Sequence, residues 1–120
     1  MRNINEALLL GNVGQDPDIR ATDFGRVATF SLATSRKWTV ETGETKEKTA
    51  WHRVVAFNAS HGAQLADLVE SYVRRGVRLL VRGSIEYKQW EKDGEKRYST
   101  EIHAREIILL ERGQGADDAR

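Results

Sequence analysis

Two kinds of apolar spacing divide the chain into predicted strands and one predicted helix. Apolar and polar residues alternate along Thr49–Phe57, Val77–Trp90 and Lys96–Leu110, which predicts three strands that each bury one face. Ala7–Val13 is largely apolar and Arg26–Arg36 is rich in small and β-branched residues, so these stretches predict two more strands. The chain is therefore expected to consist mainly of β-structure.

Glycine, proline and small polar residues mark the expected connections. Gly14–Asp18 is expected to be a loop, because its proline lacks an N–H for a sheet and its glycine interrupts the apolar run. Thr22–Gly25 predicts a turn, and Trp38–Lys48 predicts a long hairpin with a solvated tip. Asp93–Gly94 is a strong signal for a tight hairpin.

One segment changes to helical spacing. Its apolar residues recur on a single helical stripe: Leu65, Leu68, Val69, Tyr72 and Val73. Ser60 is a candidate N-cap, Arg74 and Arg75 are expected in the last turn, and Gly76 is expected just past the end. This is the one helix that the pattern predicts.

The predicted order is three strands, the helix and two strands. This order favours an all-β fold with one helix, a five-stranded Greek-key barrel of the OB-fold type with the helix between strands 3 and 4. Residues 1–112 are expected to form this domain, and residues 113–120 a short flexible tail. The order alone also fits other five-stranded barrels.

The alternation assigns strand residues to the core or to the surface. On the strand that ends at Phe57, four residues are expected outside: Trp51, Arg53, Val55 and Phe57. On the last two strands the residues expected outside are Arg78, Arg82, Ser84, Glu86, Lys88, Trp90, Arg97, Ser99, Glu101, His103 and Arg105. The residues expected inside are Leu79, Val81, Ile85, Tyr87, Tyr98, Thr100, Ile102 and Ala104. The alternation shifts at Glu106–Ile107, which predicts a β-bulge or strand end there.

Cations and tryptophans concentrate in the same two stretches. The formal net charge is +1, but residues 71–100 hold 8 basic and 4 acidic residues, and residues 36–60 hold 5 basic and 3 acidic residues. All three tryptophans, Trp38, Trp51 and Trp90, lie in these stretches. Flat rings among cations are typical of surfaces that bind single-stranded nucleic acid.

Exposed rings on the outer faces require a partner. Leaving Trp51, Phe57 or Trp90 exposed costs on the order of 1.5–3 kcal/mol each, and a base can stack on such a ring while a phosphate pairs with a neighbouring cation. The alternatives are that the rings pack in the core or in a subunit interface. Trp38 shares the alternation of inward-facing Phe30 and Leu32, so its exposure would require a bulge.

The composition offers little for catalysis. The chain has no cysteine, and His52, His61 and His103 share no metal-ligand spacing. No phosphate-binding glycine loop or Ser, His and Asp set is suggested, so no enzyme activity, cofactor or metal is expected; His52 is expected to be a hydrogen-bonded structural residue. The first apolar run is too short for a signal peptide or a bilayer span, which favours a cytoplasmic protein without a membrane partner.

Five motifs resemble one family in their order and aromatic spacing. They are LGNVGQDP at residues 10–17, LATS at 32–35, TGE at 42–44, WHRVVAF at 51–57 and KRY at 96–98. Over about residues 3–110 the chain resembles the DNA-binding domain of the bacterial single-stranded DNA-binding proteins of replication, recombination and repair.

This resemblance implies an OB-fold subunit of a homotetramer, a dimer of dimers, that coats single-stranded DNA with little sequence preference. It implies that Trp38, Trp51, Trp90 and Phe57 stack on bases and that Arg53 contacts phosphate. Further basic candidates for phosphate contact are Arg2, Arg75, Lys88 and Arg97. Two alternatives stay open: an accessory subunit of a replication restart or secretion assembly whose rings bury against a protein, and a single-stranded RNA binder.

The chain also departs from the family pattern. Gln89 replaces a common basic residue, and no lysine directly follows Phe57, which predicts weaker backbone contacts. Residues 113–120 (GQGADDAR) lack the long linker and the acidic tip that recruit other proteins in the family. We therefore expect either a truncated chain or a short variant without the docking peptide.

Overall fold

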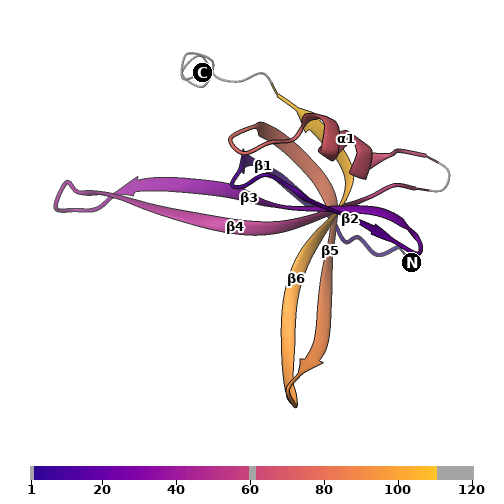
Figure 1. Cartoon of the computed structure of the whole chain (residues 1–120). Helices are drawn as coiled ribbons and strands as arrows, with labels where there is room; N and C mark the ends of the chain where they lie inside the picture. Colours follow the sequence, from indigo (N-terminus) through magenta and orange to yellow (C-terminus); the bar gives the residue numbers. More distant parts are fainter. Residues whose placement is uncertain (1, 60–61, 111–120) are drawn as a thin grey trace.

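Five strands close into a barrel and a sixth extends it at one edge (Figure 1). The computed structural model describes residues 2–59 and 62–110 of the chain. Its elements are β1 (Ala7–Val13), β2 (Asp18–Thr22), β3 (Gly25–Thr39), β4 (Thr45–Phe57), α1 (Leu65–Tyr72), β5 (Arg78–Lys92) and β6 (Glu95–Leu109). The predicted β-rich fold with one helix is confirmed.

Pairing between β1 and β3 closes the barrel. The strand order is β1-β5-β6-β4-β3-β2, and β1 also pairs with β3 through Asn12 opposite Ala33 and Val13 opposite Leu32. All pairs are antiparallel except β4 with β6, which run parallel. The ring β1-β5-β6-β4-β3 is therefore the five-stranded barrel that the sequence predicts.

The short strand β2 changes the position of the helix in the strand count. Asp18–Thr22 pairs with the start of β3, and Thr22 lies opposite Gly25 across the predicted turn. The helix consequently follows the fourth strand instead of the third, and that detail of the prediction is wrong. The strand has only five residues, DIRAT, which overlap the predicted loop and turn at its two ends and have no long alternation that would reveal a strand.

The ends of α1 differ from those expected. The helix stops at Tyr72, so Arg74 and Arg75 lie beyond its last turn, and the prediction for them is wrong. At the other end the N-cap residue is Gln64, whose side chain makes no capping hydrogen bond. Asn58 satisfies a first-turn donor instead, because its Oδ1 accepts a hydrogen bond from the backbone N–H of Asp67 at 3.1 Å. Ser60, the predicted N-cap, lies outside the described residues.

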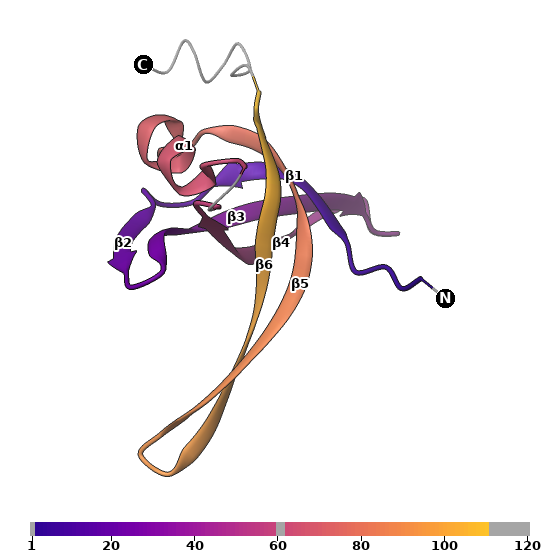
Figure 2. The same ribbon diagram turned by 90° about the vertical axis from the view of Figure 1, so that its right-hand side faces the viewer.

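The helix covers one end of the barrel, as both views show (Figures 1 and 2). Its buried residues are Leu65, Ala66 and Val69, and they join a core whose largest fully buried side chains are Leu32, Val54, Val69, Val73, Leu79 and Val81. Arg26 on β3 bridges Asp67 at 3.0 Å and Glu70 at 2.6 Å on the helix. The hydrogen bond from Arg26 lowers the pKa of Glu70, so this ion pair is present at neutral pH.

Two hairpin arms extend beyond the barrel in different directions (Figure 1). The β3–β4 arm ends at the predicted tip, where Gly43 donates a hydrogen bond to the carbonyl of Val40. The β5–β6 arm ends in a two-residue turn with positive φ at Asp93 (53°) and Gly94 (80°), as the sequence predicts for a type I′ hairpin. Because the arms lie beyond the core, alternation there no longer separates buried from exposed residues.

Tyr87 and Tyr98 show this effect. Both are predicted inside, but their exposed fractions are 81% and 70%, so this prediction is wrong. The residues have the core-facing alternation of Ile85 and Ile102, but they lie farther along the β5–β6 arm, where no core covers them.

A β-bulge lies where the strand β6 changes alternation. Arg82 pairs with Glu106 and Gly83 pairs with Ala104, which leaves Arg105 as the extra residue, one position before the predicted shift. A side chain at Gly83 would collide with the carbonyl of His103, so only glycine lets β5 and β6 approach this closely.

Candidate nucleic-acid interface

Strand pairing gathers six predicted binding residues on one outer surface. In the parallel pair of β4 and β6, Arg53 lies opposite Glu101. In the antiparallel pair of β5 and β6, Lys88 lies opposite Ser99, and Trp90 lies opposite Arg97. Paired residues point to the same side of a sheet, so the alternation extends this surface across all three strands. We call it the ring-and-cation face; it comprises Trp51, Arg53, Phe57, Lys88, Trp90 and Arg97.

The rings of this face are accessible. The exposed fractions are 64% for Trp51 and 42% for both Phe57 and Trp90, which excludes burial of these rings in the core of the subunit. Complete burial of such a ring contributes on the order of 1.5–3 kcal/mol, and a flat partner that covered the exposed part would recover a share of this free energy.

The Trp51 ring packs against the loop after β1. A Cβ built on Gly14 would lie 2.5 Å from Cζ3 of Trp51, so the indole packs directly on the glycine backbone. On the neighbouring residue, His52 Nε2 is 2.8 Å from Thr34 Oγ1, so this histidine is hydrogen-bonded, as predicted. The ring is thus held at one edge while most of it stays open to solvent.

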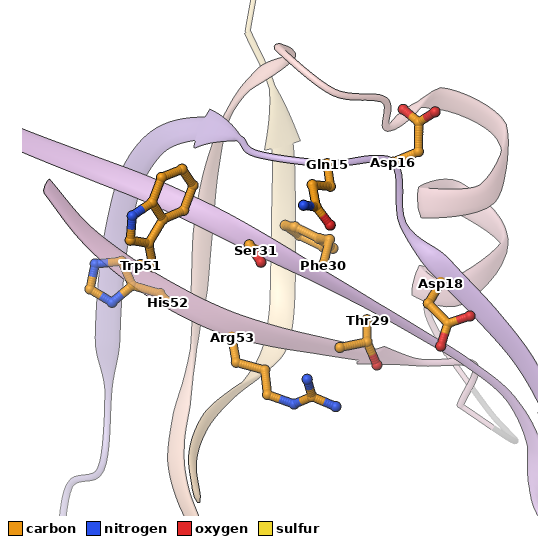
Figure 3. Close-up of a pocket in the computed structure, with 9 residues that line it drawn as sticks. All are labelled: Gln15, Asp16, Asp18, Thr29, Phe30, Ser31, Trp51, His52 and Arg53. Carbon is orange, nitrogen blue, oxygen red and sulfur yellow. The ribbon is translucent and has the colours of Figure 1, made fainter.

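Two hollows flank Arg53. The first is lined by Trp51, His52 and Arg53 together with polar side chains from the loop after β1 and from β3. Figure 3 shows Trp51 at one end of this hollow, Asp18 at the other, and Gln15 and Ser31 between them. The second is lined by Arg53, Lys88, Trp90, Ser99 and Glu101. Arg53 borders both, so one cation is within reach of whatever occupies either hollow.

A buried carboxylate lies in the middle of the face. Glu101 is 7% exposed; its Oε2 accepts a hydrogen bond from Arg53 Nε at 3.0 Å, and its Oε1 lies 3.0 Å from His103 Nε2. Burial raises the pKa of Glu101, but the hydrogen bonds from His103 and Arg53 and the charge of the nearby Lys88 together lower it by more than burial raises it. The net shift of this pKa is therefore downward. Glu101 is therefore charged at neutral pH. The sequence predicts it on the outer side but gives no sign of its burial.

Trp38 lies apart from the ring-and-cation face. The register between β3 and β4 is uninterrupted, with Ala33 opposite Trp51 and Trp38 opposite Lys46, so the two indoles point to opposite sides of the hairpin. No bulge intervenes; Trp38 is 40% exposed because the arm continues past the core. The guanidinium of Arg36 lies 5.0 Å from the centre of the Trp38 ring.

This arm therefore carries a second aromatic and basic cluster. Its residues share one side of the hairpin: Arg36, Trp38, Lys46 and Lys48. Sequence reasoning singled out Trp38 but missed the three cations, although their alternation with Trp38 across a predicted hairpin could have indicated them.

The last two predicted phosphate contacts are not on the ring-and-cation face. Arg2 precedes β1, and Arg75 lies in the turn between α1 and β5. The backbone N–H of Arg75 donates a hydrogen bond to Asp16 Oδ1 at 2.8 Å, and Asp16 lines the first hollow. Arg75 is thus near the rim of that hollow, whereas Arg2 belongs to a separate segment.

A closed five-stranded barrel with a helix over one end and exposed rings among cations defines an OB-fold nucleic-acid-binding domain. The model of the single-strand binding protein family matches residues 4–110. The chain belongs to this family, so the resemblance seen in its motifs is confirmed.

Relatives and solved structures agree with this assignment. The chain is 43% identical over 103 residues to the single-stranded DNA-binding protein of Rhizobium meliloti (strain 1021), covering 83% of the chain and 57% of that relative. It is 40% identical over 117 residues to single-stranded DNA-binding protein 1 of Xylella fastidiosa (strain 9a5c), covering 95% and 82%. The chain thus spans little more than half the length of the Rhizobium relative.

Two solved structures share the fold. The Plasmodium falciparum SSB in complex with ssDNA superposes with a TM-score of 0.79 at 36% identity, covering 92% of this chain and 98% of that one. A deletion mutant of the single-stranded DNA binding protein from Thermus aquaticus gives a TM-score of 0.74 at 33% identity, covering 93% and 52%. The predicted OB-fold class is confirmed.

Neither a metal-ligand group nor a membrane-spanning helix is found among the described residues. Within residues 2–59 and 62–110, no three histidines, aspartates or glutamates gather as a metal-binding group. In the same part of the chain no helix has the length and apolar character needed to cross a bilayer.

Proposed function

We propose that this protein binds and protects single-stranded DNA with little sequence preference. Bases stack on Trp51, Phe57 and Trp90 of the ring-and-cation face, and Trp38 takes a further base on the β3–β4 arm. The proposed phosphate contacts are Arg53, Lys88 and Arg97 on the face, with Arg2 and Arg75 beyond it. The observation that carries the proposal is the alternation of exposed rings and cations across three paired strands.

A single strand fits this face better than a duplex does. Every base has a π-face that can stack on an indole or phenyl ring, and stacking contributes about 1–3 kcal/mol per base regardless of its identity. In a duplex those faces are already stacked on one another.

The cellular role follows from this binding. A non-enzymatic coat that shields exposed bases acts where strands are separated, in replication, recombination and repair, and its place is the bacterial cytoplasm with the nucleoid. The names of the Rhizobium and Xylella relatives and the ssDNA bound in the Plasmodium complex support this role. A protein-binding accessory role has no specific observation in its favour.

Binding of matched oligonucleotides tests the function. Fluorescence anisotropy with labelled single-stranded dT, the corresponding single-stranded U and a mixed-sequence duplex of equal length should show binding to dT and little or none to the duplex. Since the rings stack on either sugar type, the U strand measures the preference between DNA and RNA. Equal affinity for the duplex would contradict the proposal, and stronger binding to U would reassign it to RNA.

We further propose that the chain forms a homo-oligomer, a homotetramer built as a dimer of dimers. On the outer side of the barrel, Leu10 of β1, Leu80 of β5 and Ile108 of β6 are cross-strand neighbours. Leu10 and Ile108 are 45% and 44% exposed, and the neighbouring Leu8 is 60% exposed. An apolar row across three strands is typical of a surface covered by a partner, and a second copy of the chain would cover it.

Sedimentation velocity tests the oligomer. The wild-type protein should sediment at several times the mass of one chain, and Leu10→Asp should shift it toward the monomer because the substitution places an unpaired charge in the interface. Circular dichroism of the variant should stay that of the folded barrel, since Leu10 points away from the core. A wild-type protein that sediments at the mass of one chain would refute the oligomer.

A further inference from the structure

We propose that Glu101 is a positioning residue for DNA binding, whose buried carboxylate holds Arg53 and His103 in fixed orientations on the ring-and-cation face. The inference rests on the proposed binding of single-stranded DNA and deepens it. It assigns a binding role to a negatively charged residue, which simple charge matching with a polyanion would reject.

The orientation of Arg53 is the first step. Its Nε donates to Glu101 Oε2 at 3.0 Å, and among the described residues its terminal Nη atoms have no hydrogen-bond partner in the protein. A guanidinium held at Nε presents both Nη groups side by side, the arrangement that binds two oxygens of one phosphate. The Arg53 side chain is 55% exposed, so without Glu101 it would sample many rotamers in solvent.

The second step connects the same carboxylate to a stacking ring. His103 Nε2 lies 3.0 Å from Glu101 Oε1, and the centres of the His103 and Phe57 rings are 5.2 Å apart with the planes tilted by 58°. This tilted contact is a favourable aromatic geometry. Glu101 therefore supports the proposed phosphate contact through Arg53 and a proposed base contact through His103 and Phe57.

The burial of Glu101 explains why a carboxylate is tolerated here. Its side chain is 8% exposed, and both oxygens are in hydrogen-bond contact with groups of the face, so its charge is directed into the protein. Glu86 provides a contrast on the same face. It lies opposite Glu101 in the β5–β6 pair but is exposed. Among the described residues it accepts a hydrogen bond only from Ser84, two residues away.

These two glutamates give a matched test. Glu86→Gln and Glu101→Gln each remove one negative charge from paired positions of the same face, so electrostatics alone predicts tighter DNA binding for both. We expect Glu86→Gln to bind a labelled dT oligonucleotide slightly more tightly than wild type. We expect Glu101→Gln to bind about three- to tenfold more weakly, because Arg53 must then lose its rotamer freedom on binding. Tighter binding by Glu101→Gln would overturn the proposal.

A double-mutant comparison separates positioning from general damage. In an Arg53→Ala background, Glu101→Gln should cause at most a small further loss through His103, because the phosphate contact that it orients is gone. An undiminished loss in that background would overturn the assignment to Arg53. Thermal unfolding of each variant shows whether the barrel is intact.

Arg53→Lys tests the proposal without altering the buried glutamate. Lysine keeps the charge but cannot bond Glu101 and present two parallel donors at once, so binding should weaken by about three- to tenfold while the salt dependence stays unchanged. Wild-type affinity in Arg53→Lys would overturn the proposal. Failure of the wild-type protein itself to bind dT would instead refute the proposed function, and the role of Glu101 with it.

Discussion

Replacing Trp51 with alanine is expected to weaken binding of single-stranded DNA by about 1–3 kcal/mol, a loss of roughly five- to 150-fold in affinity. The indole is 64% exposed and packs on the backbone of Gly14, so it presents a fixed flat surface before any base arrives. The variant loses this stacking platform. Affinity measured with a labelled dT oligonucleotide at fixed salt gives the size of the loss.

The stability of the same variant distinguishes a binding ring from a core ring. A buried tryptophan changed to alanine destabilises a protein by about 3–5 kcal/mol, whereas Trp51→Ala should change the free energy of unfolding much less. Phe24→Ala is the matched control, because Phe24 is 98% exposed at the β2–β3 turn, outside the ring-and-cation face. Phe24→Ala should bind like wild type. An unfolded Trp51→Ala, or one with wild-type affinity, would contradict the assignment.

Raising the salt concentration is the second large effect. Each phosphate neutralised on a single strand contributes about −0.7 to the slope of log affinity against log salt. Three contacts, from Arg53, Lys88 and Arg97, predict a slope of about −2, which is about a 20-fold loss of affinity between 50 and 200 mM salt. Contacts from Arg2, Arg75 or the cations of the β3–β4 arm would make the slope steeper.

Single substitutions show which residues contribute to the slope of log affinity against log salt. Arg53→Ala should reduce its magnitude by about 0.7. Trp51→Ala should lower the affinity and leave the slope unchanged, because stacking releases no counterions. A slope that is insensitive to Arg53→Ala would show that this guanidinium is not a phosphate contact.

Alternation along the strands predicted much of the face correctly. It placed Trp51, Arg53 and Phe57 outside, and strand pairing then brought them beside Lys88, Trp90 and Arg97. It was wrong for Val55 and Glu101, which it placed outside and which are buried. It also failed on the hairpin arms, for a different physical reason. Alternation shows which side of a strand a residue faces, and that side is buried only where a core covers it. Tyr87, Tyr98 and Trp38 have the alternation of core residues, but they lie beyond the core and are exposed.

The sequence patterns could not predict contacts between residues that lie far apart in the chain. The parallel pairing of β4 with β6 brings Arg53 to Glu101, 48 residues later in the chain, and only this pairing reveals a buried, hydrogen-bonded carboxylate. The hydrogen bond at the start of α1 was equally hidden, because Asn58 lies nine residues before Asp67 and reaches it only after a loop folds back. The sequence signals are local, whereas these contacts form between residues that only the folded chain brings together.

The intrinsic fluorescence of the wild-type protein, titrated with poly-dT at low salt, tests the central claim most directly, since the rings proposed to stack are themselves the fluorophores. Stacking of bases on these indoles should strongly quench the tryptophan emission, and the quenching should saturate with added strand and be reversed by salt. Trp51→Ala should lose part of this quenching. Unchanged emission at saturating concentrations of strand and protein would contradict the claim that bases stack on these rings.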